Sequence, residues 1–171
     1  MKQKLIISLL FGLIALICHA QEKSKWDKLS WLTGEWKGDG NGQPGKGGGT
    51  FSFDFDLEKN ILVRKSHSEY TSNDSKAPKV HEDLMIIYPG PDEGQLKADY
   101  FDNEGHIINY LVTGSDKAIT FISEKQANAP IFRLTYTLLD QSTVNVKFEM
   151  SPDRVNFRTY IEGNSKRIEQ H

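Results

Sequence analysis

Histidine offers the most chemistry in this chain, because a neutral imidazole can bind a metal ion or a haem iron. Four histidines lie beyond residue 20, namely His67, His81, His106 and His171. The first three lie in separate strand-like segments, and converging strands could bring their rings to one metal ion. No two of them have the spacing of ligands to one site, so the sequence predicts separate histidines and no metal site. The sequence does not decide whether each of these histidine rings points to the inner or the outer face of its strand.

The glycine-rich loop that begins at Gly40 resembles two phosphate-binding patterns. Residues 40–45 read G-x-G-x-x-G, and residues 40–46 read G-x-x-x-x-G-K. Both patterns bind phosphate through backbone N–H groups at the start of a helix. Here Gly47 stands where Ser or Thr is needed, and the segment leads into the strand-like run Phe51–Phe55. The sequence therefore predicts a connection between two strands and no nucleotide site.

Motifs of catalytic sites are missing from the chain. It has no G-x-S-x-G, no H-E-x-x-H, and a single cysteine, Cys18. Asp54 and Asp56 point outward if the phenylalanines that alternate with them point inward, and the adjacent Glu82 and Asp83 point to opposite faces of one strand. The sequence predicts no catalytic residue and favours a protein that is not an enzyme, although this point stays open.

The N-terminus predicts export from the cytoplasm. Lys2 and Lys4 precede the uninterrupted apolar run Leu5–Ile17, and the sequence Cys-His-Ala at 18–20 supplies small residues before a cleavage point. We therefore expect a signal peptide at residues 1–20 and a domain at residues 21–171, in the periplasm or outside the cell. A helix of this run would be ~20 Å long, too short to span ~30 Å of hydrocarbon, so no membrane span is expected after processing.

A lipid anchor on Cys18 is the alternative, but Ile17 is larger than the residue that usually precedes a lipidated cysteine. The formal net charge of the full chain is −2, with charges of both signs interspersed, so nothing predicts a nucleic-acid partner. The oligomeric state stays open.

Apolar residues recur with period 2 along most of the chain, which predicts strands. The N-terminal exception is Trp26–Leu32, where large apolar residues recur every three positions and predict a short helical plug. Most connections are too short for a crossover helix, so sequential strands should pair antiparallel, and closure would remove both edges. We expect an all-β fold, a single antiparallel up-and-down barrel of about ten strands. The expected strands are the segment around Trp36, Phe51–Phe55, Ile61–Tyr70, Val80–Tyr88, Gln95–Phe101, His106–Val112, Ala118–Glu124, Ile131–Leu138, Thr143–Met150 and Val155–Ile161.

Residues 34–42 read G-x-W-x-G-x-G-x-G. A G-x-W at the first strand after a short plug resembles the signature of the calycin superfamily, which includes lipocalins and fatty-acid-binding proteins. The longer glycine pattern is similar to nitrobindin-like haem-binding barrels and to related exported bacterial barrels. The resemblance implies that Gly34 and Trp36 belong to one closed end of the barrel, where a basic residue packs on the Trp. Arg158 and Arg167 are candidates, and strand phase favours Arg167.

A ten-strand barrel is wider than an eight-strand barrel, which side chains just fill, so interior volume for a ligand should remain. Aromatic residues at alternating strand positions would line it, and a few polar groups would orient the ligand. The candidate cavity residues are Trp36, Phe53, Phe55, Arg64, Tyr70, Tyr100, Tyr110, Phe121, Tyr136 and Phe157.

These observations predict a non-enzymatic exported barrel that binds a small apolar or amphipathic molecule. A haem protein with redox chemistry at iron and a fully packed interaction module are the alternatives. In the nitrobindin-like family a histidine near the C-terminus holds the iron, but Val155–Ile161 contains none. We therefore expect no haem and no other cofactor, although His67, His81 or His106 could bind iron from another strand. The inward residues of this last segment should be Val155, Phe157, Thr159 and Ile161.

Overall fold

The computed structural model describes residues 24–40, 47–70, 79–127 and 129–169. The expected signal peptide at residues 1–20, its cleavage point before Gln21 and most of the glycine-rich loop lie outside these residues. Within the described part of the chain, no helix has the length and apolarity that crossing a membrane requires.

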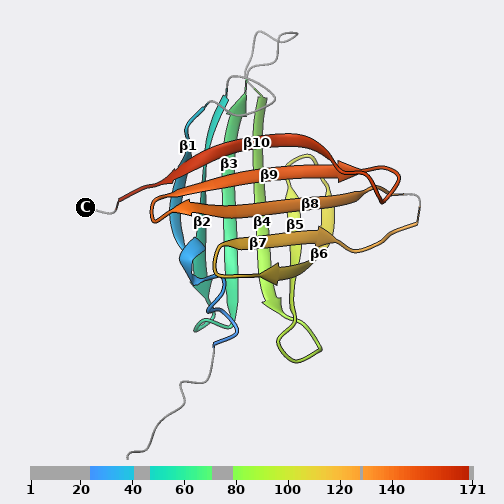
Figure 1. Cartoon of the computed structure of the whole chain (residues 1–171), viewed down its shortest axis with the longest axis horizontal. Helices are drawn as coiled ribbons and strands as arrows, with labels where there is room; N and C mark the ends of the chain where they lie inside the picture. The colour runs from blue at the N-terminus through green and yellow to red at the C-terminus, as the bar shows by residue number, and fades with distance from the viewer. Residues whose placement is uncertain (1–23, 41–46, 71–78, 128, 170–171) are drawn as a thin grey trace, which may run out of the picture.

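Ten antiparallel strands form one closed barrel, in which each strand pairs with the next and β1 pairs with β10. The predicted up-and-down barrel is thereby confirmed (Figure 1). The strands are β1 (Gly34–Gly38), β2 (Gly47–Asp56), β3 (Ile61–Tyr70), β4 (Lys79–Pro89), β5 (Leu96–Asp102), β6 (Ile107–Gly114), β7 (Ala118–Ser123), β8 (Ile131–Asp140), β9 (Thr143–Ser151) and β10 (Arg158–Arg167).

Alternation of apolar and polar residues decides which face of each strand points inward. In β2, Phe51 and Phe53 are buried whereas Asp54 is exposed. Figure 1 shows β7, β8 and β9 crossing over β2, β3 and β4, so the inward faces of the two groups of strands pack on each other.

The segment before β1 seals one end of this core. Trp26, Leu29 and Leu32 are buried at their three-residue spacing, and Ser30–Leu32 forms a short 3-10 helix. The Leu29 N–H donates to the carbonyl of Trp26 and the Leu32 N–H donates to that of Leu29, so three-residue turns link these residues and place their side chains on one side. The Trp26 indole N–H also donates to the carbonyl of Lys59 in the β2–β3 connection, at 2.7 Å.

The last strand begins later than the sequence predicts. The strand expected at Val155–Ile161 is found at Arg158–Arg167, and Val155 is 76% exposed. Asp153 explains the delay, because its carboxylate accepts hydrogen bonds from the backbone N–H groups of Val155 and Asn156 and stabilises a turn. The pairing also slips between Thr159 and Ile161, so Thr159 lies opposite the outward Glu149, whereas Ile161 lies opposite the inward Phe148. Of the residues expected to point inward in this segment, only Ile161 is at an inward position of the strand.

Candidate functional site

The interior of the barrel has two ends that differ in chemistry. We call the end sealed by Trp26, Leu29 and Leu32 the plugged end. We call the opposite end, where β3, β5, β7 and β9 finish, the loop end.

At the plugged end, Trp36 is fully buried beneath Arg167. The Arg167 guanidinium carbon lies 4.2 Å from the centre of the indole ring, and the guanidinium donates to the carbonyls of Thr33 and Trp31 at 2.5 and 2.6 Å. Gly34 has a φ of +100°, and a Cβ there would meet Arg167 Nη1 at 3.0 Å. Of the two arginines that the sequence offered for this contact, Arg167 is the one that makes it.

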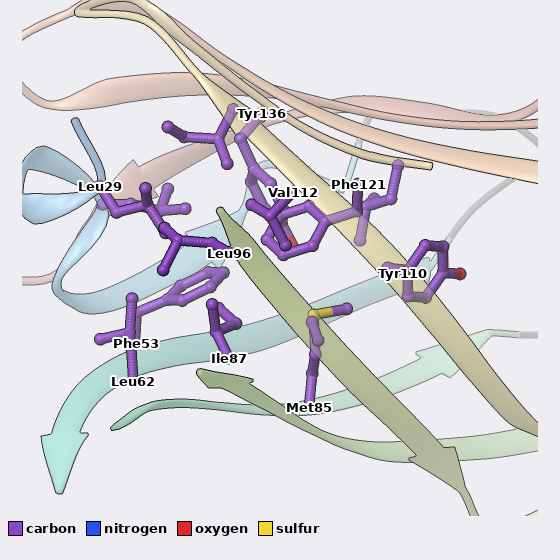
Figure 2. Close-up of a cluster of buried hydrophobic side chains, with 14 of the residues drawn as sticks. Leu29, Phe53, Leu62, Met85, Ile87, Leu96, Tyr110, Val112, Phe121 and Tyr136 are labelled. Carbon is purple, nitrogen blue, oxygen red and sulfur yellow. The ribbon is translucent and has the colours of Figure 1, made fainter. Parts of the chain in front are cut away.

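An apolar cluster fills the interior above the plug, as Figure 2 shows, with Leu29 at one side and Tyr110 at the other. Phe53, Leu62, Met85 and Ile87 are completely buried in this cluster. This part of the interior is a packed core contributed by β2, β3 and β4 on one side and by later strands on the other.

Toward the loop end, the inner wall becomes polar at Arg64. Arg64 follows Leu62 on the inward face of β3 and is only 7% exposed. Its Nη1 forms an ion pair with Oδ1 of Asp83 on β4, and the Asp83 side chain is 5% exposed. Burial by itself lowers the pKa of Arg64, but Tyr136 and Asp83 more than offset this and raise the pKa above its ordinary value, so the guanidinium stays charged.

Hydrogen bonds extend from this pair to the loop end. His81 Nε2 lies 3.6 Å from Asp83 Oδ2 and 3.0 Å from the Tyr100 hydroxyl, which donates to Asp102 Oδ2 at 3.2 Å. Asp102 in turn lies 2.9 Å from His106 Nδ1. We call these six residues the polar network: Arg64, His81, Asp83, Tyr100, Asp102 and His106.

Asp83 and Asp102 face each other directly across β4 and β5, and their side chains are 5% and 4% exposed. Like charges directly opposite each other on neighbouring strands destabilise a sheet, so this placement lowers the stability of the barrel. Burial opposes ionisation of Asp102, but hydrogen bonds from the His106 backbone and ring lower its pKa. The polar network thus contains more buried negative charge than Arg64 balances.

Aromatic rings surround Arg64 on the inner wall. Its guanidinium carbon lies 5.7 Å from the centre of the Phe51 ring, and neighbouring rings make edge or tilted contacts at centre-to-centre distances of 5.4–6.4 Å. The continuous belt of rings is Phe51, Tyr136, Phe121, Tyr110 and Tyr100. Burial raises the pKa of Tyr136 to about 12 and raises the pKa values of Tyr100 and Tyr110 as well, so all three hydroxyls stay protonated at neutral pH.

Two buried polar atoms in this belt lack a hydrogen-bond partner among the described residues. They are Arg64 Nε and the Tyr136 hydroxyl oxygen. The Tyr136 hydroxyl is close to the Arg64 guanidinium, but without the geometry of a full hydrogen bond. A buried polar group without a partner is costly, and in native proteins it often marks a place where a water or a ligand binds.

Large side chains at the loop end are only partly covered. Phe132 and Phe148 stack at 5.8 Å and are half-buried, while Tyr160 and Ile161 beside Phe148 are 62% and 42% exposed. Ile108 on β6 also packs on the core without being fully buried. Apolar side chains therefore continue from the buried belt to solvent at this end.

The structure groups the sequence-predicted cavity residues into four places. Arg64, Tyr100, Tyr110, Phe121 and Tyr136 meet in the belt, next to the buried Phe53. Trp36 and Phe55 belong to the plugged end, where Phe55 contacts Trp26 at 5.5 Å. Tyr70 is half-buried where β3 finishes.

Phe157 differs from its predicted place. Its ring lies 3.8 Å from the guanidinium carbon of Arg133, which is bonded to Glu149 at 2.7 Å on the outer face of β8 and β9. Because β10 begins only at Arg158, Phe157 belongs to the preceding connection and is not aligned with the inward positions of the strand.

The three candidate histidines lie in different surroundings. His67 is on the outer face between Glu82 and Glu69, His81 faces the interior, and the side chain of His106 is 62% exposed at the loop end. In the described part of the chain, no three histidine, aspartate, glutamate or cysteine side chains are grouped as a metal site would need.

Sequence reasoning missed Phe51, His81, Asp83 and Asp102 as parts of this site. In β4 the face that carries His81 and Asp83 also carries Met85, while the other face carries the equally apolar Leu84 and Ile86. Local periodicity could not choose between these faces. The cross-strand register, in which Arg64 pairs with Met85, places Asp83 beside Arg64, and the local sequence does not give this register.

A shallow hollow of about 400 Å³ lies over β3, β4 and β5, and its lining is Lys65, Glu82, Asp83, Leu84, Phe101, Asp102 and Asn103. Asp83 and Asp102 thus border this hollow, whereas Arg64 and Tyr136 do not line it.

Neither a scan against protein-family models nor a search of curated proteins found a match to this chain. The closed ten-stranded antiparallel barrel is consistent with a calycin-like barrel.

Proposed function

We propose that this protein is an exported, non-enzymatic carrier that binds a small amphipathic molecule inside the barrel, from the loop end. The observation that supports this most is the pair of buried, unpartnered polar atoms, Arg64 Nε and the Tyr136 hydroxyl, within a belt of aromatic rings. Aromatic walls with a few convergent polar groups are typical of small-molecule sites.

The difference between the two ends supports the direction of entry. The plugged end is sealed by Trp26, Leu29 and Leu32, all at most 4% exposed. At the loop end, partly exposed aromatic and aliphatic side chains lead from solvent to the belt. The apolar part of a ligand would lie against Phe132, Phe148 and Ile108, with its polar group at Arg64.

Adjacent isoleucines on β6 provide a test, since Ile108 faces the interior and Ile107 is 62% exposed on the outer face. The neutral dye N-phenylnaphthylamine is titrated into the parent protein and into Ile108→Trp and Ile107→Trp. We expect saturable binding by the parent and by Ile107→Trp, and at least about tenfold weaker binding by Ile108→Trp, a loss of ~1.4 kcal/mol. Equal binding by both variants would place the dye outside the barrel and contradict the proposal.

Small molecules retained through native purification, identified by mass spectrometry, would name the natural ligand. Intact mass of the exported form tests the expected start at Gln21, since acyl chains on Cys18 would show a lipoprotein instead.

A further inference from the structure

We infer that the ligand presents a neutral hydrogen-bonding group, such as a hydroxyl or an amide, to Arg64 and Tyr136, and that the site discriminates against carboxylates. This inference rests on the proposed function and adds the chemical class of the ligand. It follows from the ion pair of Arg64 with Asp83, which already balances the charge of the guanidinium.

The charge of Arg64 is already balanced inside the barrel. Its Nη1 is paired with the Asp83 carboxylate, whose side chain is 5% exposed, so little solvent screens the pair. A second anion at Arg64 would add negative charge next to Asp83. In a poorly screened interior, that repulsion opposes the attraction to the guanidinium.

Asp102 makes the site still less favourable for an anion. Its carboxylate is buried directly opposite Asp83, and Tyr100 and His81 connect the two. The lowered pKa of Asp102 keeps it ionised at neutral pH. An anionic ligand entering from the loop end would therefore meet two buried carboxylates and a single guanidinium.

The unpartnered atoms are suited to a neutral oxygen. Arg64 Nε–H can only donate, and the Tyr136 hydroxyl both donates and accepts. One carbonyl or hydroxyl oxygen between them can accept from both, and a hydroxyl can also donate to Tyr136. Both buried groups are then satisfied and no net charge is introduced.

Three probes with the same ten-carbon chain separate head-group charge from apolar contact: decanol, decanamide and decanoate. Each competes with N-phenylnaphthylamine for the purified protein near neutral pH. We expect decanol and decanamide to bind at least about tenfold more tightly than decanoate, a difference of ~1.4 kcal/mol. Decanoate binding as tightly as decanol, or more tightly, would overturn the inference while leaving the proposed carrier function intact.

An apolar interior alone could also disfavour decanoate, and charge variants distinguish this cause. In Asp83→Asn, Arg64 lacks its counter-ion, so decanoate should gain at least about tenfold relative to decanol. Asp102→Asn should reduce the discrimination in the same direction and serves if Asp83→Asn does not fold. Glu149→Gln is the control, because Glu149 is a buried carboxylate on the outer face, bonded to Arg133.

Unchanged discrimination in both Asp83→Asn and Asp102→Asn would contradict the assigned role of these carboxylates. If the dye itself does not bind, the carrier function fails and this inference fails with it. If the dye binds but none of the three probes displaces it, this inference alone is contradicted.

Discussion

Arg167 and Arg64 are both inward arginines that lie over an aromatic ring, Arg167 at the plugged end and Arg64 in the belt, farther toward the loop end. Arg167 covers Trp36 and donates to two backbone carbonyls of the plug, so its guanidinium is used to hold the chain together. Arg64 lies near Phe51 and pairs with Asp83, and its Nε has no hydrogen-bond partner among the residues that the structure describes. The same residue type thus serves packing at one end and leaves binding capacity at the other.

Their ionisation differs for a related reason. Burial lowers the pKa of Arg167, whose bonded partners are neutral carbonyls, whereas Tyr136 and Asp83 raise the pKa of Arg64 despite its deeper burial. The Asp83 carboxylate neutralises the buried guanidinium of Arg64. Removing it should leave an uncompensated charge, whereas a substitution at the plugged end removes apolar packing.

The largest expected effect is loss of packing at the plugged end. Trp36→Ala should reduce the free energy of unfolding by about 3–5 kcal/mol, because a fully buried indole and its contact with Arg167 are removed. Denaturant unfolding followed by circular dichroism measures the change. Tyr160→Ala removes an aromatic ring that is 62% exposed at the loop end, and should cost less than about 1 kcal/mol. Equal losses of unfolding free energy in the two variants would contradict the proposed difference between the two ends.

Next in size is the loss of charge balance at Arg64. Asp83→Asn should destabilise the protein by about 3 kcal/mol, because a buried guanidinium loses its counter-ion. The double variant Arg64→Met with Asp83→Leu should recover most of this loss, since an apolar pair can replace a buried ion pair. A double variant that remains as unstable as Asp83→Asn would show that the pair stabilises the barrel.

A smaller effect concerns the backbone beneath Arg167. Gly34→Ala should cost about 1–3 kcal/mol, because φ is +100° there and the new Cβ would press on Arg167 Nη1. Gly38→Ala on the same strand is the matched control, since its nearest neighbour would lie 3.6 Å away and its φ is ordinary. Thermal unfolding of the two variants compares them directly. Similar unfolding midpoints for the two variants would contradict this prediction, because Arg167 would then accommodate the new Cβ without loss of stability.

The smallest effect is a pH dependence on the outer face. Hydrogen bonds to Glu82 and Glu69 raise the pKa of His67 above its ordinary 6.5. A raised pKa in the folded state stabilises the protein below the unfolded pKa, and this contribution disappears as pH rises through the folded value. The difference in unfolding midpoint between the parent and His67→Gln should therefore be larger near pH 5.5 than near pH 8.5. A difference in unfolding midpoint that increases with pH would contradict this prediction.

Most strand positions were readable because each strand buries one face. The segment predicted at Ile61–Tyr70 is β3 without a change of boundary, since its apolar residues alternate and turn residues flank it. The error at Val155–Ile161 has a local cause, because Asp153 accepts backbone hydrogen bonds that apolar periodicity does not register. The candidate site was readable in part: Arg64, Tyr100, Tyr110 and Tyr136 were named, but the carboxylates beside them were not.

By itself, the sequence determined the strand pattern, the barrel class and the three-residue spacing of the plug, because these depend on residues near one another in the chain. Only the tertiary structure decided which face of β4 points inward, since both of its faces are apolar toward the plugged end. The cross-strand register places Asp83 next to Arg64 and opposite Asp102. The charge balance of the interior is therefore a property of three strands together, and it decides which head group the barrel would accept.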